Sequence, residues 1–127
     1  MNRYTHFARL GAVHPSSRAR TGGGQGLYAG WEPAMDVYDR KKDVVIVLEM
    51  PGCDGDRIEV TVEKQILLIK GVRERRVPEG AQGVQQLEIP YGAFVRQVRL
   101  GPGFNADGIQ AEYSGGFLTI TVPRRWR

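Results

Sequence analysis

The stretch that decides the fold is Ala111-Glu112-Tyr113-Ser114-Gly115-Gly116-Phe117-Leu118, which continues as Thr119-Ile120-Thr121-Val122-Pro123. Apolar side chains occupy every second position on both sides of the glycine pair, a period typical of a strand with one buried face. Two adjacent glycines readily adopt positive φ, so the stretch predicts a hairpin that ends at proline. The alternating apolar residues are Ile109, Ala111, Tyr113, Leu118, Ile120 and Val122.

From residue 31 onward, short apolar segments follow one another and are separated by glycine and proline. Residues 77–86 read as a loop, and residues 84–89 are compatible with one more strand inside it. About eight short strands without a long helix predict an all-β fold, an antiparallel β-sandwich. Besides the hairpin, strands are predicted at residues 35–38, 44–50, 58–62, 66–69 and 94–100.

The length and composition fit one domain with one core. No apolar run among the 127 residues is long enough to cross a membrane, and the first residues lack the apolar segment of a secretory signal. We therefore expect a cytoplasmic protein. Cys53 is the one cysteine, so no intrachain disulfide can form, and a reduced thiol is expected.

The formal charge of +4 is unevenly distributed along the chain. Residues 1–30 hold four arginines and no acid, and residues 124–127 hold three arginines and no acid. The segment 31–123 holds the other eleven basic residues and all fourteen acids, so its net charge is −3. A mildly acidic domain between two basic ends does not predict a nucleic-acid-binding surface.

Residues 1–30 have the composition of a flexible arm, with a glycine-rich tract at residues 21–26. Phe7 and Leu10 lie three apart, which is compatible with a short helix over residues 2–10. We divide the chain into this arm, a β domain at 31–123 and a very short tail at 124–127. Apolar side chains in and next to the arm are candidates for binding other proteins: Tyr4, Phe7, Leu10, Val13, Leu27, Tyr28 and Trp31.

Four motifs in order resemble the α-crystallin domain of small heat-shock proteins. They span residues 31–123 and occur at compatible spacing. They are Pro33-Ala34-Met35-Asp36-Val37-Tyr38, then Leu48-Glu49-Met50-Pro51-Gly52 with Asp56-Arg57-Ile58-Glu59-Val60 after it, then Gly92-Ala93-Phe94-Val95-Arg96 followed by Leu100, and the Ala-x-x-x-x-Gly-x-Leu order of the hairpin.

The resemblance implies an immunoglobulin-like sandwich. In the bacterial and plant branch of that family, the long loop, here residues 73–91, carries a strand that crosses to a partner subunit. We therefore expect a strand-exchanged homodimer in which residues 84–89 pair with residues 35–38 of the other chain. The implied interface residues are Met35, Asp36, Val37, Tyr38, Val84, Gln85, Gln86, Leu87, Glu88, Ile89, Arg96 and Arg99.

Arg96 shares a strand face with Phe94 and Val98, so burial of its charge would require a partner. Glu88 and Asp36 are the candidate partners, within the chain or across a dimer. The resemblance makes Arg96 an interface residue. The alternative is an exposed arginine at the end of the strand. For Arg99, an interface position and a plain surface position are equally compatible with the sequence.

The family docks a C-terminal Ile-x-Ile/Val anchor into a groove at the edge of the sandwich, and client segments compete for that groove. This chain has four residues after Pro123 and no separate anchor, by nature or by truncation, so a higher oligomer beyond the dimer is left open. The alternative for the groove residues is that they form only core. The candidate client groove comprises Ile58, Val60, Val62, Ile109, Ala111, Tyr113 and Leu118.

Catalytic, cofactor and metal sites are not predicted. The glycine tract at 22–26 lacks the Lys-Ser/Thr ending of a phosphate-binding loop, and His6 and His14 lie in the arm. Asp54 and Asp56 are too few oxygen ligands for a calcium loop, and one cysteine with two distant histidines makes no zinc site.

The resemblance therefore implies a stress-response protein rather than an enzyme: an ATP-independent holdase chaperone that binds partly unfolded client proteins and prevents their aggregation. No small-molecule substrate, cofactor, membrane or nucleic acid is expected as a partner. The alternative is a p23-like β-sandwich co-chaperone or scaffold domain that binds one defined folded partner.

Overall fold

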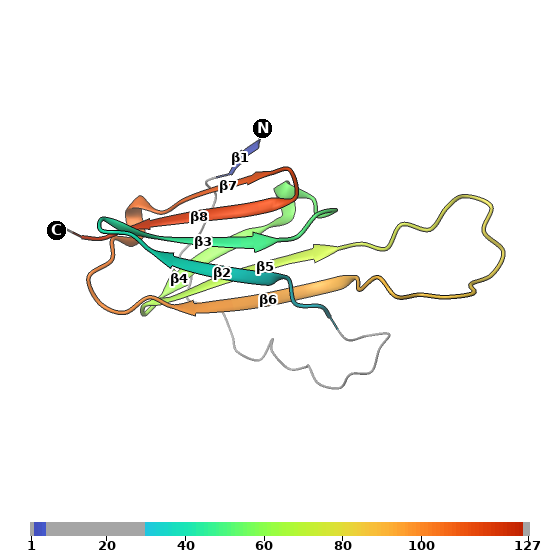
Figure 1. Ribbon diagram of the computed structural model, residues 1–127, viewed down its shortest axis with the longest axis horizontal. Helices are drawn as coiled ribbons and strands as arrows, with labels where there is room; N and C mark the ends of the chain where they lie inside the picture. The colour runs from blue at the N-terminus through green and yellow to red at the C-terminus, as the bar shows by residue number, and fades with distance from the viewer. Residues whose placement is uncertain (1, 5–29, 126–127) are drawn as a thin grey trace.

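The computed structural model describes residues 2–4 and 30–125 (Figure 1). These residues form two antiparallel sheets that pack face to face, so the predicted all-β sandwich is confirmed. One sheet has the strand order β1-β7-β8-β3-β2, and the other has the order β4-β5-β6. The strands are β1 (Asn2–Tyr4), β2 (Ala34–Asp39), β3 (Asp43–Glu49), β4 (Glu59–Glu63), β5 (Ile66–Arg73), β6 (Gly92–Arg99), β7 (Gln110–Ser114) and β8 (Phe117–Pro123).

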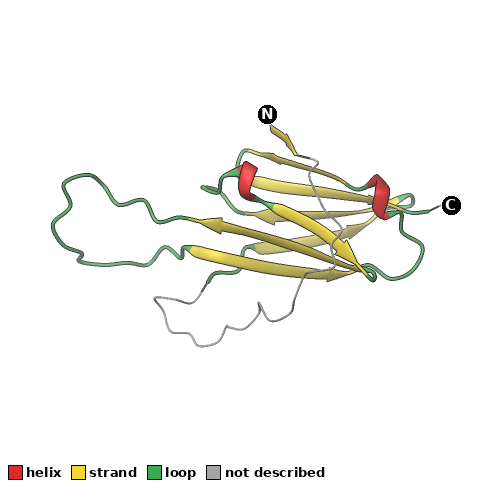
Figure 2. Cartoon of the chain, turned by 180° about the vertical axis from the view of Figure 1, so that it is seen from behind, coloured by secondary structure: helices red, strands yellow, loops and turns green. Residues whose placement is uncertain are grey.

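The only helical segments in these described ranges are two single turns of 3₁₀-helix, η2 (Gly55–Arg57) and η3 (Ala106–Gly108), drawn in red in Figure 2. Each turn is capped by the side chain preceding it, because Asp54 and Asn105 accept a hydrogen bond from the backbone N–H two residues later. None of the described helices is long and apolar enough to cross a membrane.

Alternating apolar positions from both sheets form the core. On the larger sheet, Ile46 lies opposite Ile120 and both are fully buried, as are Leu48 and Leu118 in the next pair on that face. Val60, Leu67 and Ile69 face them from the smaller sheet. Because the period of two puts all these side chains on inward faces, the sequence pattern alone positions the two layers.

Two tight hairpins set the strand register. Gly115 and Gly116 have φ of 63° and 87° and join β7 to β8, as the glycine pair predicted. Lys64 and Gln65, with φ of 54° and 69°, make the equivalent two-residue turn from β4 to β5. Positive φ at both central positions is the geometry that follows the twist of paired strands, so Lys64 and Gln65 adopt it although they have side chains.

One local prediction differs from the structure, and another concerns a segment that was expected to pair with a partner chain. Asn2–Tyr4 is a strand that pairs with β7, so the helix over residues 2–10 is wrong at its start, and residues 5–10 lie outside the described residues. Residues 84–89 form no strand in the single chain. A strand needs a neighbour to pair with, and the long loop projects beyond the ends of the sheets, where the described part of its own chain offers none (Figure 1).

Past β8 the chain stays attached to the domain. The backbone N–H of Arg124 donates to the carbonyl of Lys42 at 2.9 Å, and that of Arg125 donates to the carbonyl of Gly103 at 2.6 Å. Within the described residues, the predicted tail therefore begins as a continuation of the sandwich edge.

Candidate interaction site at strand β2 and the long loop

Strand β2 forms one edge of the larger sheet. It pairs with β3 along its whole length, from Ala34 opposite Glu49 to Asp39 opposite Val44, and no described strand lies on its other side. Alternate backbone N–H and C=O groups of an edge strand point away from the sheet and can pair with another strand. Val37 and Tyr38 on this strand are 48% and 53% exposed. The edge therefore lacks a partner among the described strands and is partly apolar.

The long loop, residues 74–91, leaves the smaller sheet after β5 and returns at the start of β6. Figures 1 and 2 show it extending well beyond the strands. Its apolar residues Val77, Val84, Leu87 and Ile89 are more than half exposed. Together with Val37 and Tyr38, they make up six of the seven exposed large apolar side chains in the described part of the chain. Exposed apolar surface thus concentrates on β2 and the long loop, and all of these six side chains except Val77 are among the predicted interface residues.

The remaining predicted interface residues lie on both segments. Asp36 accepts a hydrogen bond from the hydroxyl of Tyr38 at 3.1 Å. This interaction raises the pKa of Tyr38 above its ordinary value. In the loop, the amide of Gln86 donates to the carboxylate of Glu88. Met35 is half-buried and packs against the core, and Gln85 is exposed.

Arg96 is half-buried, and within one chain its partners are residues just before β2. Its Nη1 donates to the carbonyl of Pro33 at 3.1 Å and lies 3.8 Å from a carboxylate oxygen of Glu32. Within one chain it contacts neither Asp36 nor Glu88 by a hydrogen bond or ion pair in the described residues. The guanidinium therefore ties β6 to the segment just before β2, while Arg99 lies exposed at the end of β6.

The predicted client groove lies mostly inside the core. Ile58, Val60, Ile109, Ala111, Tyr113 and Leu118 are buried, and only Val62 is half-buried. In the single chain, six of these seven side chains are therefore core residues, as in the alternative interpretation. Beside them, the outer edge of β7 is paired with β1, in a register that sets Asn2 opposite Tyr113 and Tyr4 opposite Ala111.

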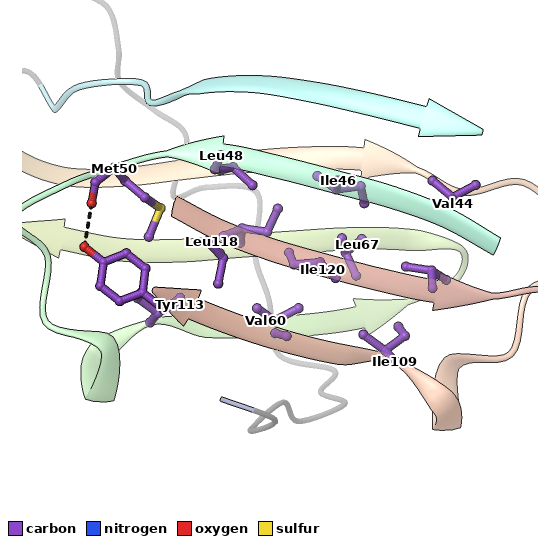
Figure 3. Close-up of a cluster of buried hydrophobic side chains, with 14 of the residues drawn as sticks. Val44, Ile46, Leu48, Met50, Val60, Leu67, Ile109, Tyr113, Leu118 and Ile120 are labelled. Atoms are coloured by element: carbon purple, nitrogen blue, oxygen red, sulfur yellow. Dashed lines mark hydrogen bonds between the residues drawn. The ribbon is translucent and has the colours of Figure 1, made fainter. Parts of the chain in front are cut away.

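Tyr113 has a polar role in this core (Figure 3). Its hydroxyl donates to the carbonyl of Met50 at 2.8 Å and accepts from the backbone N–H of Cys53 at 3.3 Å. Burial raises the pKa of the Tyr113 hydroxyl, and burial also raises the pKa of the half-buried Cys53 thiol. The hydroxyl thereby fixes the turn through which the chain passes from β3 to the smaller sheet. The sequence pattern did not indicate this role, because an inward tyrosine has the same spacing as an inward leucine.

Of the predicted arm residues, Trp31 is packed onto the domain. Its Nε1–H donates to the carbonyl of Gly92 at 2.9 Å, and its ring meets the ring of Phe94 edge to face at a centroid distance of 5.6 Å. Trp31 is therefore part of the sandwich and not of a free arm. Phe7, Leu10, Val13, Leu27 and Tyr28 lie outside the described residues, and for Tyr4 only the backbone pairing with β7 is described.

The geometry offers little to catalysis. The described residues contain no group of three or more histidine, cysteine, aspartate or glutamate side chains that could hold a metal ion. A cavity of about 310 Å³ is lined by Lys64, Gln65, Arg125 and mainly apolar residues. A nucleophile paired with a general base is not among its lining residues.

Comparison with known proteins agrees with this geometry. The chain matches the model of the Hsp20/alpha crystallin family over residues 36–127. It is 32% identical over 93 residues to spore protein SP21 of Stigmatella aurantiaca, which covers 73% of this chain and 55% of that protein. It is 36% identical over 92 residues to an 18.9 kDa heat shock protein of Oryza sativa, which covers 72% of this chain and 52% of that one. The chain thus spans little more than half the length of these two relatives.

Solved structures show the same architecture. A small heat-shock protein from Xylella fastidiosa, whose structure is described as having a distinct high order structure, superimposes with a TM-score of 0.70 at 35% identity, covering 78% of this chain and 91% of that one. The hspA protein from Xanthomonas axonopodis gives a TM-score of 0.69 at 34% identity, covering 76% and 97%. With a matching family model over most of the sandwich and relatives above 30% identity, the chain belongs to the Hsp20/alpha crystallin family of small heat-shock proteins.

Proposed function

We propose that the protein is an ATP-independent holdase chaperone, which binds partly unfolded clients and keeps them from aggregating. The observation that carries the proposal is that a chain of this family also has apolar side chains interspersed with glycine and arginine in residues 1–30. A holdase needs no catalytic groups, because burial of client apolar surface supplies its binding free energy. At about 25 cal/mol per Å², covering ~400 Å² yields roughly 10 kcal/mol before association and ordering costs are subtracted.

The working unit we propose is a homodimer in which residues 84–89 of each chain pair with β2 of the other. Each of the two segments offers backbone groups for pairing and exposed apolar side chains. The backbone of residues 84–89 pairs with no described strand, and Val84, Leu87 and Ile89 are exposed. The outer edge of β2 likewise has no described neighbour, and Val37 and Tyr38 are exposed there. Pairing them satisfies backbone groups on both sides and covers apolar surface on both sides. The exchange thus explains why a domain of this family exposes these residues when it is alone.

Clients are proposed to bind mainly through residues 1–30. In this segment, apolar residues are interspersed with glycine and arginine, and a segment of that composition can adapt to many partner shapes. The apolar residues are Phe7, Leu10, Val13, Leu27 and Tyr28. Exchange would cover five exposed apolar side chains, Val37, Tyr38, Val84, Leu87 and Ile89, which leaves the arm as the main client-binding segment. The four arginines of the arm would add attraction for acidic clients.

The test is the aggregation of a heated or reduced client, followed by light scattering without ATP. The intact chain at near-equal mass ratio should suppress aggregation, and a variant lacking residues 1–30 should suppress it less. A variant with Phe7, Leu10 and Tyr28 changed to serine should lose protection, whereas changing Arg9, Arg18 and Arg20 to glutamine should retain most of it. No suppression by the intact chain with several clients would refute the proposal. Capture of a single folded partner in fixed stoichiometry would instead favour a co-chaperone of the p23-like kind.

A further inference from the structure

We propose that Arg73 is the positioning residue of the exchange loop: its guanidinium fixes the end of the loop, and through it the direction in which residues 84–89 leave the subunit. The inference rests on the strand exchange proposed above. It concerns a cluster at the neck of the loop, made of Arg73, Trp31, Tyr91, Pro90 and Pro51, which we call the neck clasp.

The hydrogen bonds of Arg73 reach two separate segments. Its Nη2 and Nε donate to the carbonyl of Pro90 at 2.6 and 3.2 Å, and its Nη1 donates to the carbonyl of Pro51 at 3.0 Å. One planar guanidinium carries five donors in fixed directions, so it can hold two backbone carbonyls at once. Pro90 is thereby tied both to the end of β5 and to the turn that follows β3.

The same guanidinium lies on aromatic rings. Its Cζ is 3.8 Å from the ring centroid of Trp31 and 5.3 Å from that of Tyr91. Trp31 is itself fixed, since its backbone N–H donates to the carbonyl of Ala93 at 3.3 Å and its indole N–H donates to Gly92. A cation over an aromatic face is attracted by the negative charge of the ring face, most strongly for tryptophan. Arg73 therefore joins the start of the domain to the last residues of the loop.

The neck clasp lies where it can affect the direction of the exchange segment. The β5–β6 ladder ends at the pair Arg73 and Gly92, and no pairing between the two sides of the loop follows it in the described residues. Pro90 directly follows Ile89, the last residue of the segment proposed to cross to the partner. Holding the Pro90 carbonyl restricts the directions open to residues 84–89, so less conformational entropy is lost when they pair with β2 of another chain.

Lysine cannot replace arginine in this geometry. An ammonium group retains the positive charge, but it has neither the planar fork that reaches Pro90 and Pro51 together nor a flat face to lie on Trp31. Arg73→Lys should thus release the loop and leave the sandwich intact. Arg76→Lys is the matched control, because Arg76 is exposed in the loop and is not part of the neck clasp.

The experiment compares the full-length wild type, Arg73→Lys and Arg76→Lys by sedimentation equilibrium and by hydrogen exchange. Arg73→Lys should raise the dimer dissociation constant at least about tenfold, the effect of losing one charge-assisted hydrogen bond. At concentrations where the wild type is dimeric, the amides of residues 84–89 and of β2 should exchange faster in Arg73→Lys, while those of β3, β5 and β8 keep their protection. Arg76→Lys should match the wild type.

Three results would overturn the inference. If Arg73→Lys dimerises with the wild-type constant, the neck clasp does not position the loop, while the chaperone proposal stands. If it loses protection equally in β3, β5 and β8, Arg73 serves subunit stability alone. If the wild type remains monomeric at all concentrations, strand exchange itself is refuted together with the role of Arg73.

Discussion

The ring of Phe94 lies directly over Gly71 across the β5–β6 ladder. The two residues are opposite in the register, and a Cβ atom placed on Gly71 would lie 2.7 Å from both Cε2 and Cζ of Phe94. The ring is buried, and its edge-to-face neighbour is Trp31. Glycine on one strand therefore makes room for an aromatic ring that supports the base of the long loop.

Replacing Gly71 with alanine should destabilise the subunit, because the added methyl group would force the Phe94 ring out of its place. Overpacking of this kind costs about 1–3 kcal/mol, measurable as a lower midpoint in urea unfolding. Gly83→Ala is the control, since no atom lies within 4 Å of a Cβ placed there. Equal midpoints for the two variants would show that Phe94 does not restrict position 71.

Tyr113→Phe should also destabilise the subunit, for a polar reason. The change retains the ring in the core and removes the hydroxyl, so the carbonyl of Met50 and the N–H of Cys53 lose their shared partner. A buried backbone group without a partner costs about 1–3 kcal/mol. Tyr91→Phe, which retains the ring beneath Arg73, is the matched control in the same unfolding assay. A Tyr113→Phe chain as stable as the wild type would contradict this account of the turn.

The difference in unfolding free energy between the wild type and Tyr113→Phe should depend on pH in a predictable direction. Burial raises the pKa of Tyr113 above its ordinary value of 10.0, so the folded state favours the neutral hydroxyl. The stability from this group is complete below pH 10 and is lost as the pH rises through the folded-state pKa. The free-energy gap between wild type and Tyr113→Phe should therefore narrow above pH 10, and a gap that widens there would have the wrong sign.

At the acid end, Asp43 should make stability depend on pH. It is buried at the start of β3 and accepts two hydrogen bonds from Arg40, at 2.6 and 2.9 Å. The Arg40 guanidinium holds the pKa of Asp43 below its ordinary value of 3.8, so the stability it contributes is present above that pH and is lost as the pH falls further. Asp43→Asn should have a lower free energy of unfolding than the wild type near neutrality, and the difference between the two should shrink below pH 3.8. The exposed Glu59→Gln is the control, and a constant gap down to pH 2 would refute the assignment.

Side-chain periodicity was enough to predict the two layers, because each strand with one apolar face needs one covering layer. The hairpin at Gly115 and Gly116 was also predictable from local sequence, because both turn residues need positive φ and glycine readily adopts it. The equivalent turn at Lys64 and Gln65 carries no such glycine signal, and its geometry follows from the pairing of the strands on either side.

Other features depend on contacts that periodicity does not encode. The sequence pattern of an apolar strand face is the same whether that face packs on the opposite sheet or binds a docked peptide. Ile58 and Val60 could therefore be assigned to a groove although they are core. The partner of Arg96 is the carbonyl of Pro33, a backbone group 63 residues away that no charge pattern indicates. The neck clasp of Arg73 likewise joins three distant segments.

The dimer site should respond to a charge in the exchange segment and not to one elsewhere in the loop. Leu87→Asp places a carboxylate where we propose that an apolar side chain is covered, which should weaken dimerisation at least about tenfold. Val77→Asp is the matched control, because Val77 is similarly exposed in the same loop but lies outside residues 84–89. Sedimentation equilibrium separates the two, and equal dimer constants would contradict the proposed pairing.

The most direct test of the central claim is disulfide trapping between two kinds of chain. Both carry Cys53→Ser; one also carries Val37→Cys on β2, and the other carries a single cysteine scanned through residues 84–89. Strand pairing predicts disulfides between the two chains, with yields that alternate along the scan because successive side chains of a strand point to opposite faces. Yields that are uniformly low, or that do not vary with position, would contradict the exchange of this segment between subunits.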